Sequence, residues 1–171
     1  IGKTYCQLAS GKKNEVDMAV AAAQKAQKSW GSTSQDERCK LLNALADGIE
    51  KRFDEFALAE SIDNGKPLWL TKAMDIPRAI SNLRFFGNAI TQFSSEAHET
   101  VGANAINYTL RQPIGVVACI SPWNLPLYLF TWKIAPALAA GNAVIAKPSE
   151  VTPLTAFLLS QVCIKAGLPP G

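Results

Sequence analysis

The chain has 171 residues, of which 48% are hydrophobic and 18% are charged, a composition typical of a folded protein and not of a disordered one. The 17 basic and 14 acidic residues leave a net charge of +3, too small to indicate a nucleic-acid partner. The longest apolar stretch, residues 114–146, is interrupted by prolines, glycine, asparagine and lysine, so no membrane-spanning helix is predicted. Small-molecule partners are therefore expected.

The four cysteines stand far apart in the sequence and form no CxxC pair: Cys6, Cys39, Cys119 and Cys163. Neither a zinc site nor a redox motif is predicted, and no metal is expected. Reduced thiols indicate a cytoplasmic protein, with an organelle matrix as the alternative. The chain starts without Met and stops in a turn sequence at residues 168–171, which we interpret as the sign of a fragment.

Residues 14–30 have apolar side chains at a spacing of about 3.6, which predicts an amphipathic helix. The apolar side of this helix is expected to consist of Val16, Val20, Ala23 and Trp30. Ser34 and Glu37 then have the spacing of a capping box, and a long helical pattern follows them. We expect that second helix to break near Arg52.

The sequence DNGKP at residues 63–67 supplies a left-handed stop residue and a proline, and so predicts the end of a helix. Helical spacing resumes over residues 68–93, with a break or restart at Pro77. One face of this helix is expected to carry Ile76, Ile80, Leu83 and either Phe86 or Gly87. The first half of the chain is therefore predicted to be helix-rich.

The pattern changes to strands after His98. Residues 105–110 alternate like an exposed strand, and residues 115–120 form an apolar run that predicts a strand buried on both faces. Residues 125–140 predict a helix with Pro126 in its first turn, and residues 142–146 predict a second short strand. Thr152 and Pro153 are expected to cap a last helix that ends at Ala166. This order predicts an α/β fold with parallel strands and a right-handed crossover.

Such βαβ units bind ligands at the carboxyl ends of their strands. The two loops at these ends, residues 121–124 and 147–150, are therefore candidate ligand-binding loops. Asn124 lies between Pro122 and Pro126, which restrict its backbone and hold a neutral amide rigidly. That amide suits hydrogen bonding to an oxygen that gains negative charge. Asn124 could equally cap the following helix, and the spacing alone leaves both interpretations open.

Lys147 and Glu150 place a cation and an anion in one short loop. A ribose diol is a natural ligand for such a pair, because the carboxylate accepts from one hydroxyl and the ammonium donates to the other. The alternative is an exposed ion pair that contributes little. No GxGxxG motif follows either strand, so the glycine pattern does not predict a dinucleotide site.

Four motifs together resemble the aldehyde dehydrogenase superfamily: ISPWNLP at residues 120–126, TWK at 131–133, PALAAGN at 136–142 and KPSE at 147–150. The resemblance extends over essentially the whole chain, and residues 122–142 are most similar to the 2-aminomuconic and hydroxymuconic semialdehyde dehydrogenases. It implies the N-terminal part of that fold. Residues 1–103 would be the helical part of the cofactor-binding domain, residues 104–113 a strand of the oligomerisation domain, and residues 114–171 the first βαβα portion of a Rossmann-like NAD-binding domain.

The resemblance also implies roles for single residues. Asn124 would contribute to the oxyanion hole, and Lys147 and Glu150 would contact the adenosine ribose. The cofactor's passage toward the nicotinamide would be lined by Ile120, Ser121, Pro122 and Trp123. The aldehyde tunnel would be bordered by Leu125, Tyr128, Leu129 and Trp132, for which core packing is the alternative. Lys133 would support the site or relay protons, with a structural role as the alternative.

The family's nucleophilic cysteine and general-base glutamate have no counterpart in these 171 residues, because none of the four cysteines matches the nucleophile. The fragment alone is therefore expected to be inactive. The resemblance implies a parent homodimer or homotetramer that oxidises an aldehyde, with semialdehydes among the candidates, and that prefers NAD over NADP because Glu150 repels a 2′-phosphate. The alternative is a non-catalytic relative whose exposed strand near residues 105–110 pairs with another chain.

Overall fold

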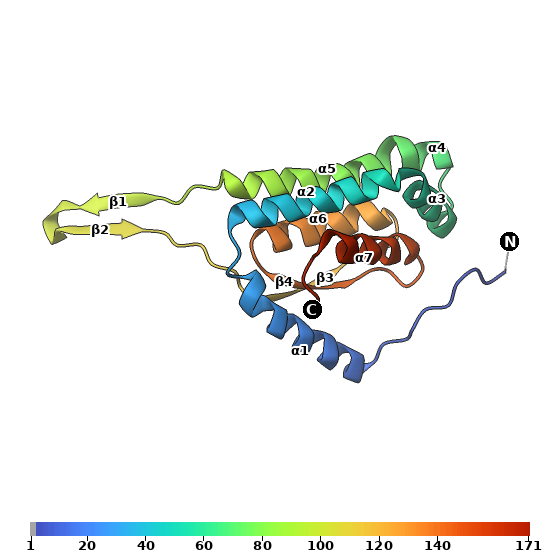
Figure 1. Ribbon diagram of the computed structural model, residues 1–171, viewed down its shortest axis with the longest axis horizontal. Helices are drawn as coiled ribbons and strands as arrows, with labels where there is room; N and C mark the ends of the chain where they lie inside the picture. Colours follow the sequence, from blue (N-terminus) through green and yellow to red (C-terminus); the bar gives the residue numbers. More distant parts are fainter. Residues whose placement is uncertain (1–2) are drawn as a thin grey trace.

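Helices make up the first half of the chain, as predicted. They are α1 (Lys13–Trp30), α2 (Gln35–Lys51), α3 (Phe53–Asn64), α4 (Leu68–Leu70) and α5 (Ile76–Thr91). The computed structural model describes residues 3–171. In Figure 1, α2 and α5 run alongside each other and alongside a later helix, α6 (Pro126–Ala139), to form a helical layer.

The predicted ends of α2 and α3 are confirmed. Glu37 N–H donates to Ser34 Oγ at 3.2 Å, and Glu37 Oε2 accepts from Ser34 N–H at 2.8 Å, so both halves of the capping box form. Helix α2 ends at Lys51, next to the predicted break at Arg52. Helix α3 ends at Asn64 and is capped by Gly65, which has a φ of 75°, the left-handed conformation that glycine adopts without strain.

A π-helical turn, Thr71–Asp75, joins α4 to α5. Pro77 lies in the first turn of α5, where a residue without an N–H group is tolerated, so the restart predicted at Pro77 is confirmed. The hydroxyl of Thr71 donates to the carbonyl of Ala57 at 3.0 Å and fixes this turn against α3. The predicted buried face of α5 is also confirmed, since Ile76, Ile80, Leu83 and Gly87 are buried.

The strands form two separate pairs in the second half. Strands β1 (Ala97–Thr100) and β2 (Ala105–Tyr108) pair antiparallel around a 3₁₀ turn at Val101–Ala103, and this hairpin projects from one end of the molecule (Figure 1). All residues of both strands are exposed, as predicted for β2. Strand β1 was not predicted, because AHET has no apolar alternation and lies in the part assigned to helices.

Strands β3 (Val116–Ile120) and β4 (Ala143–Lys147) pair in parallel, with α6 as the crossover and α7 (Leu154–Ala166) after β4, which confirms the predicted α/β order. Figure 1 shows the two strands between α1 and the helices α6 and α7. The prediction that β3 is buried on both faces is wrong, because Ala118 is exposed and Ile120 is 67% exposed. Ala118 and Ile120 are two residues apart and share one face of the strand, so this face is left uncovered in the described region.

The hydrophobic core lies where α2, α3, α5, α6 and α7 meet. Its fully buried large apolar side chains are Phe56, Leu42, Leu45, Ile49, Ile76, Leu83, Leu127 and Leu159. Helix α1 contributes less than predicted. Ala23 and Trp30 are buried, but Val20 is only half-buried and Val16 is 56% exposed, because the first turns of α1 extend past the elements that cover its second half.

Candidate functional site

The two loops predicted to carry the chemistry start side by side at the carboxyl ends of β3 and β4. Ile120 is the register partner of Lys147, and Ser121 N–H donates to the carbonyl of Lys147 at 3.1 Å. The parallel pairing therefore brings residues 121–125 and residues 148–153 to one edge of the sheet. This edge is the place where ligands bind in parallel α/β folds.

Asn124 is exposed in the first of these loops, and its side chain makes no hydrogen bond to any of residues 3–171. The N-cap of α6 is Leu125, and no side chain caps the helix from that position. The interpretation of Asn124 as a helix cap is therefore wrong. Its amide is available to donate to a ligand at the strand ends.

The first turn of α6 instead finds its acceptor on α3. Leu127 N–H donates to Glu60 Oε2 at 3.3 Å, and Glu60 has no solvent-exposed surface. The pKa of Glu60 is raised to about 7, chiefly because the carboxyl group is buried. The hydrogen bond from Leu127 opposes this shift. The charge of Asp75 raises the pKa further, whereas Lys66 and the Thr155 hydroxyl lower it. Lys66 Nζ also pairs with Asp75 Oδ2 at 2.9 Å beside this carboxyl group.

Helix α7 is held by α3 in the same way. Leu154 N–H donates to Asp63 Oδ2 at 2.8 Å, and the Tyr5 hydroxyl donates to Asp63 Oδ1 at 2.8 Å. Burial raises the pKa of Asp63, and the hydrogen bond to Asp63 raises the pKa of Tyr5 to about 12. The prediction that Thr152 caps α7 is wrong, because Pro153 is the N-cap and the buried hydroxyl of Thr152 has no partner in the described region.

Glu60 and Asp63 were not identified from the sequence. A signal for Glu60 was present, because it follows Phe53 and Phe56 at the helical spacing of apolar residues and so falls on the buried side of α3. A carboxyl group on an apolar helix face requires a partner. The position of that partner, Leu127, could not be deduced from local spacing.

Lys147 and Glu150 form the ion pair that their spacing allows. Lys147 Nζ and Glu150 Oε2 are 2.7 Å apart, and the side chains are 58% and 74% exposed. The hydrogen bond from Lys147 lowers the pKa of Glu150, which keeps that group ionised. A cation and an anion in contact with solvent match the acceptor and donor needs of a diol, so the residues present fit an adenosine ribose.

The residues predicted to line the cofactor's passage differ in exposure. Pro122 is exposed, Ile120 is 67% exposed and Trp123 is 59% exposed, whereas Ser121 is buried and its hydroxyl has no partner among residues 3–171. The three exposed side chains precede Asn124 in the same strand-end segment and leave apolar surface open to solvent there. Such a surface suits the uncharged parts of an elongated ligand.

An aromatic row extends from α6 to α5. The rings of Tyr128 and Trp132 are 5.6 Å apart, the rings of Trp132 and Phe86 are 6.2 Å apart, and the Arg78 guanidinium lies 5.2 Å from the Tyr128 ring centre. Trp132 is exposed, whereas Leu125, Tyr128 and Leu129 are half-buried, so this face of α6 is not fully enclosed in the core. Arg78 was not singled out from the sequence. It is exposed and forms no ion pair within the described part of the chain.

Lys133 is exposed, and its carbonyl accepts a hydrogen bond from Cys119 Sγ at 3.7 Å. Burial raises the pKa of the Cys119 thiol and raises that of Cys163 to about 11, so neither is a thiolate at neutral pH. All four cysteines are free thiols.

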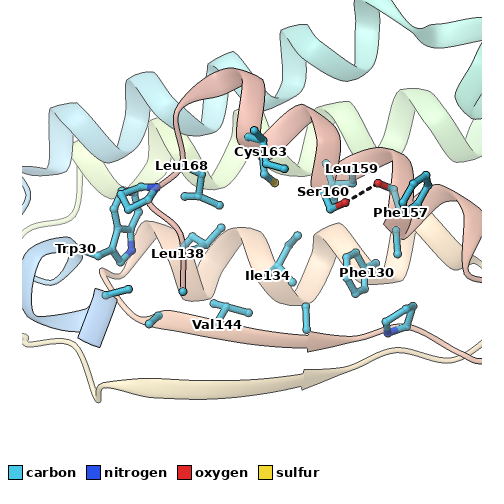
Figure 2. Close-up of a pocket in the computed structure, with 18 of the residues that line it drawn as sticks. Trp30, Phe130, Ile134, Leu138, Val144, Phe157, Leu159, Ser160, Cys163 and Leu168 are labelled. Carbon is cyan, nitrogen blue, oxygen red and sulfur yellow. Dashed lines mark hydrogen bonds between the residues drawn. The ribbon is translucent and has the colours of Figure 1, made fainter. Parts of the chain in front are cut away.

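A cavity of about 520 Å³ lies between β4, α6 and α7. Figure 2 shows apolar side chains such as Phe130, Ile134 and Leu159 pointing into it. None of the predicted site residues lines this cavity, so it is separate from the strand-end site.

In residues 3–171 no group of three or more His, Cys, Asp or Glu side chains could hold a metal ion. No helix of the described region is long and apolar enough to cross a membrane.

Comparisons with known proteins agree over the whole chain. The model of the aldehyde dehydrogenase family matches residues 1–171. The human 2-aminomuconic semialdehyde dehydrogenase is 51% identical over 99% of this chain, and the 2-hydroxymuconic semialdehyde dehydrogenase of Pseudomonas sp. strain CF600 is 48% identical over the same share. The aldehyde dehydrogenase KauB of Pseudomonas aeruginosa superimposes with a TM-score of 0.94 at 37% identity over 99% of this chain. The chain spans 35%, 36% and 34% of these three proteins, about a third of their length.

Proposed function

Because the chain belongs to the aldehyde dehydrogenase family, we propose that the protein carrying it oxidises an aldehyde to a carboxylic acid with a nicotinamide dinucleotide as the acceptor. The similarity to muconic semialdehyde dehydrogenases, expected from residues 122–142, is confirmed. The observation that carries the proposal is the exposed Asn124 amide, which caps no helix and lies at the same sheet edge as the Lys147–Glu150 pair.

In this proposal, Asn124 donates a hydrogen bond to the carbonyl oxygen of the aldehyde as a thiolate attacks its carbon and the oxygen gains negative charge. A rigid neutral donor stabilises that charge without losing a proton itself. The thiolate and the general base are proposed to come from outside these 171 residues, since none of the four cysteines matches the family's nucleophile. Burial also keeps Cys119 and Cys163 protonated.

The residues of β3, β4 and their loops are proposed to bind the dinucleotide. Glu150 accepts from one ribose hydroxyl, Lys147 donates to the other, and Ile120, Pro122 and Trp123 provide an apolar surface toward Asn124. When bound there, a nicotinamide would supply the hydride acceptor for the oxidation of the substrate carbon. NAD is the proposed cofactor, with NADP less favoured, because the Glu150 charge would repel a 2′-phosphate.

The aromatic row supports a substrate with a second, negatively charged group. Arg78 lies over Tyr128 without an acidic partner in the described residues, so a carboxylate could pair with it beside the ring. A muconic semialdehyde carries a carboxylate as well as its aldehyde. We propose a semialdehyde of this chemical class as the substrate, with Leu125, Tyr128 and Trp132 along its path and Lys133 in a supporting role.

The β1–β2 hairpin is proposed to serve assembly into a homodimer or homotetramer. Its apolar side chains include Ile106 and Tyr108, which are 74% and 67% exposed. Apolar groups on a projecting strand pair mark an interaction surface. A protein that acted only through this hairpin, as a non-catalytic binding protein, would show no turnover.

The test is Asn124→Ala in the full-length protein, assayed with NAD and two substrates, a carboxylate-bearing semialdehyde and an uncharged aldehyde. Loss of one oxyanion-hole donor should lower kcat by roughly 10² to 10³ with both substrates. The KM of the variant for NAD should equal that of the wild type. In the wild type, the KM for the carboxylate-bearing semialdehyde should be lower than the KM for the uncharged aldehyde. A normal kcat in the variant would contradict the role of Asn124.

A further inference from the structure

Helix α3 provides hydrogen-bond acceptors for both helices that follow the strand-end loops. Glu60 Oε2 accepts from Leu127 N–H in α6, and Asp63 Oδ2 accepts from Leu154 N–H in α7. Three positions separate the two acidic residues, so they lie on neighbouring turns of one helix face. We refer to Glu60 and Asp63 together as the α3 carboxylate pair.

These long-range bonds take the place of local caps. The first amides of a helix have no partner within the helix, and neither α6 nor α7 has a side-chain cap at its own N-cap position. Pro126 has no N–H, which makes Leu127 the first donor of α6. When it is ionised, a carboxyl group at this end also interacts favourably with the helix dipole.

The α3 carboxylate pair therefore fixes the far end of each loop. The loop that contains Asn124 is held at one end by the β3 ladder and at the other by the first turn of α6. The loop that follows Lys147 and contains Glu150 is held in the same way by β4 and α7. Because Glu60 is fully buried, it touches no ligand and acts through the helices packed against it. Its backbone hydrogen bond is to Leu127 in α6, and the Thr155 hydroxyl of α7 also acts on its carboxyl group.

We propose that Glu60 and Asp63 are positioning residues with separate effects, Glu60 placing the Asn124 amide through α6 and Asp63 placing the Lys147–Glu150 pair through α7. This inference rests on the functions proposed above for those residues. Its distinguishing consequence is that two neighbouring carboxyl groups on one helix control two different kinetic constants.

The experiment compares Glu60→Leu and Asp63→Leu in the full-length enzyme, with Glu55→Gln, an exposed carboxylate of the same helix, as the control. A displaced catalytic group can lower the rate by roughly 10², so partial displacement of Asn124 in Glu60→Leu should lower kcat by roughly tenfold with an unchanged KM for NAD. Asp63→Leu should raise KM for NAD by roughly tenfold with an unchanged kcat. A purely structural role predicts that both variants change the same constant, and this result, or no change in either, would overturn the proposal.

Two further variants separate positioning from a general loss of folding. Glu60→Gln keeps an oxygen acceptor for Leu127 N–H and should retain kcat. Glu60→Asp keeps the charge but withdraws the acceptor by one methylene, and it should lower kcat even if Glu60→Leu does not fold. In the Asn124→Ala background Glu60→Leu should cause no further loss of kcat, because the group that it positions is gone. An additional loss there, or a normal kcat in Glu60→Asp, would overturn the proposal.

Amide hydrogen exchange supplies a measurement that does not depend on turnover. Glu60→Leu should accelerate exchange at Leu127 and not at Leu154, and Asp63→Leu should do the reverse. If Asn124→Ala has normal activity, the proposed function fails, while these exchange rates still decide whether α3 fixes the two helices. Unchanged exchange at both amides would overturn the positioning role itself.

Discussion

At the scale of single residues, the ionisation of Glu60 is coupled to folding. Its pKa is raised from 4.5 to about 7 in the folded chain, so between these values the unfolded chain releases a proton that the folded chain retains. The stability contributed by Glu60 is therefore fully present below pH 4.5, falls as pH rises to 7 and is constant above that. Over this pH range the free energy of unfolding decreases by roughly 3 kcal/mol in total.

Glu60→Gln should remove this pH dependence. The free energy of unfolding should be measured by denaturant titration for both proteins at pH 5 and pH 8. The value for the variant, relative to that of the wild type, should be higher at pH 8 than at pH 5. Glu55→Gln is the matched control, because the pKa of Glu55 is lowered by Arg52 and its titration lies below this window. An equal difference from the wild type at both pH values would contradict the raised pKa of Glu60.

Glu150 determines the expected cofactor preference. Glu150→Gln keeps most of the side-chain shape and removes the charge that would meet a 2′-phosphate, so kcat/KM for NADP relative to NAD should rise by roughly tenfold. Lys147, which is 2.7 Å from this carboxylate, offsets part of the repulsion, and a preference rather than strict exclusion follows. Glu99→Gln on the exposed hairpin is the control. An unchanged ratio would show that Glu150 does not contact the ribose.

Sequence reasoning found the exposed polar residues at the strand ends because loops after parallel strands are recognisable from chemistry and spacing. Asn124, Lys147 and Glu150 were placed at one edge on that basis, and the structure brings their loops together. Glu60 and Asp63 were missed because a cap supplied from 67 or 91 residues away leaves no local pattern. The wrong assignment of Thr152 has the same origin.

At the scale of elements, the end of α3 depends on Gly65. Gly65 has a φ of 75°, and a Cβ added there would meet no neighbouring atom within 4 Å. The cost of Gly65→Ala is therefore the backbone strain of an alanine in the left-handed conformation, about 1 kcal/mol. Gly102→Ala also meets no neighbour but lacks a positive φ, and it serves as the control. Denaturant unfolding should show destabilisation for Gly65→Ala alone. Equal stability of the two variants would contradict this assignment.

Elements that carry their own end signals were predicted well. The capping box of α2, the stop at Gly65 and the restart at Pro77 are local chemistry, and all three are confirmed. Burial was predicted less well because it depends on neighbours: the apolar run of β3 was expected to be covered on both faces, but its exposed Ala118 and Ile120 show otherwise. Strand β1 forms only because β2 pairs with it, which the sequence AHET does not reveal.

At the scale of the whole molecule, the 171 residues contain the proposed oxyanion donor and ribose-binding pair, whereas the nucleophilic thiol is proposed to lie outside them. Incubation of the isolated chain with NAD and a panel of aldehydes should therefore produce no NADH, whereas the full-length protein should. The absorbance of NADH measures this directly. Turnover that disappears when one of the four cysteines is blocked would show that the nucleophile lies within this chain.

The two hydrogen bonds from α3 join residues that are 67 and 91 positions apart in the chain. Contacts across such distances form later than helices and hairpins, because the closure of a long loop must come first. During synthesis, α3 leaves the ribosome well before Leu127 and Leu154. Its two carboxyl groups therefore have no amide partners until those residues have been added to the chain. The strand-end loops are therefore expected to reach their final geometry last, and a newly made chain would have its helices before it has a binding site.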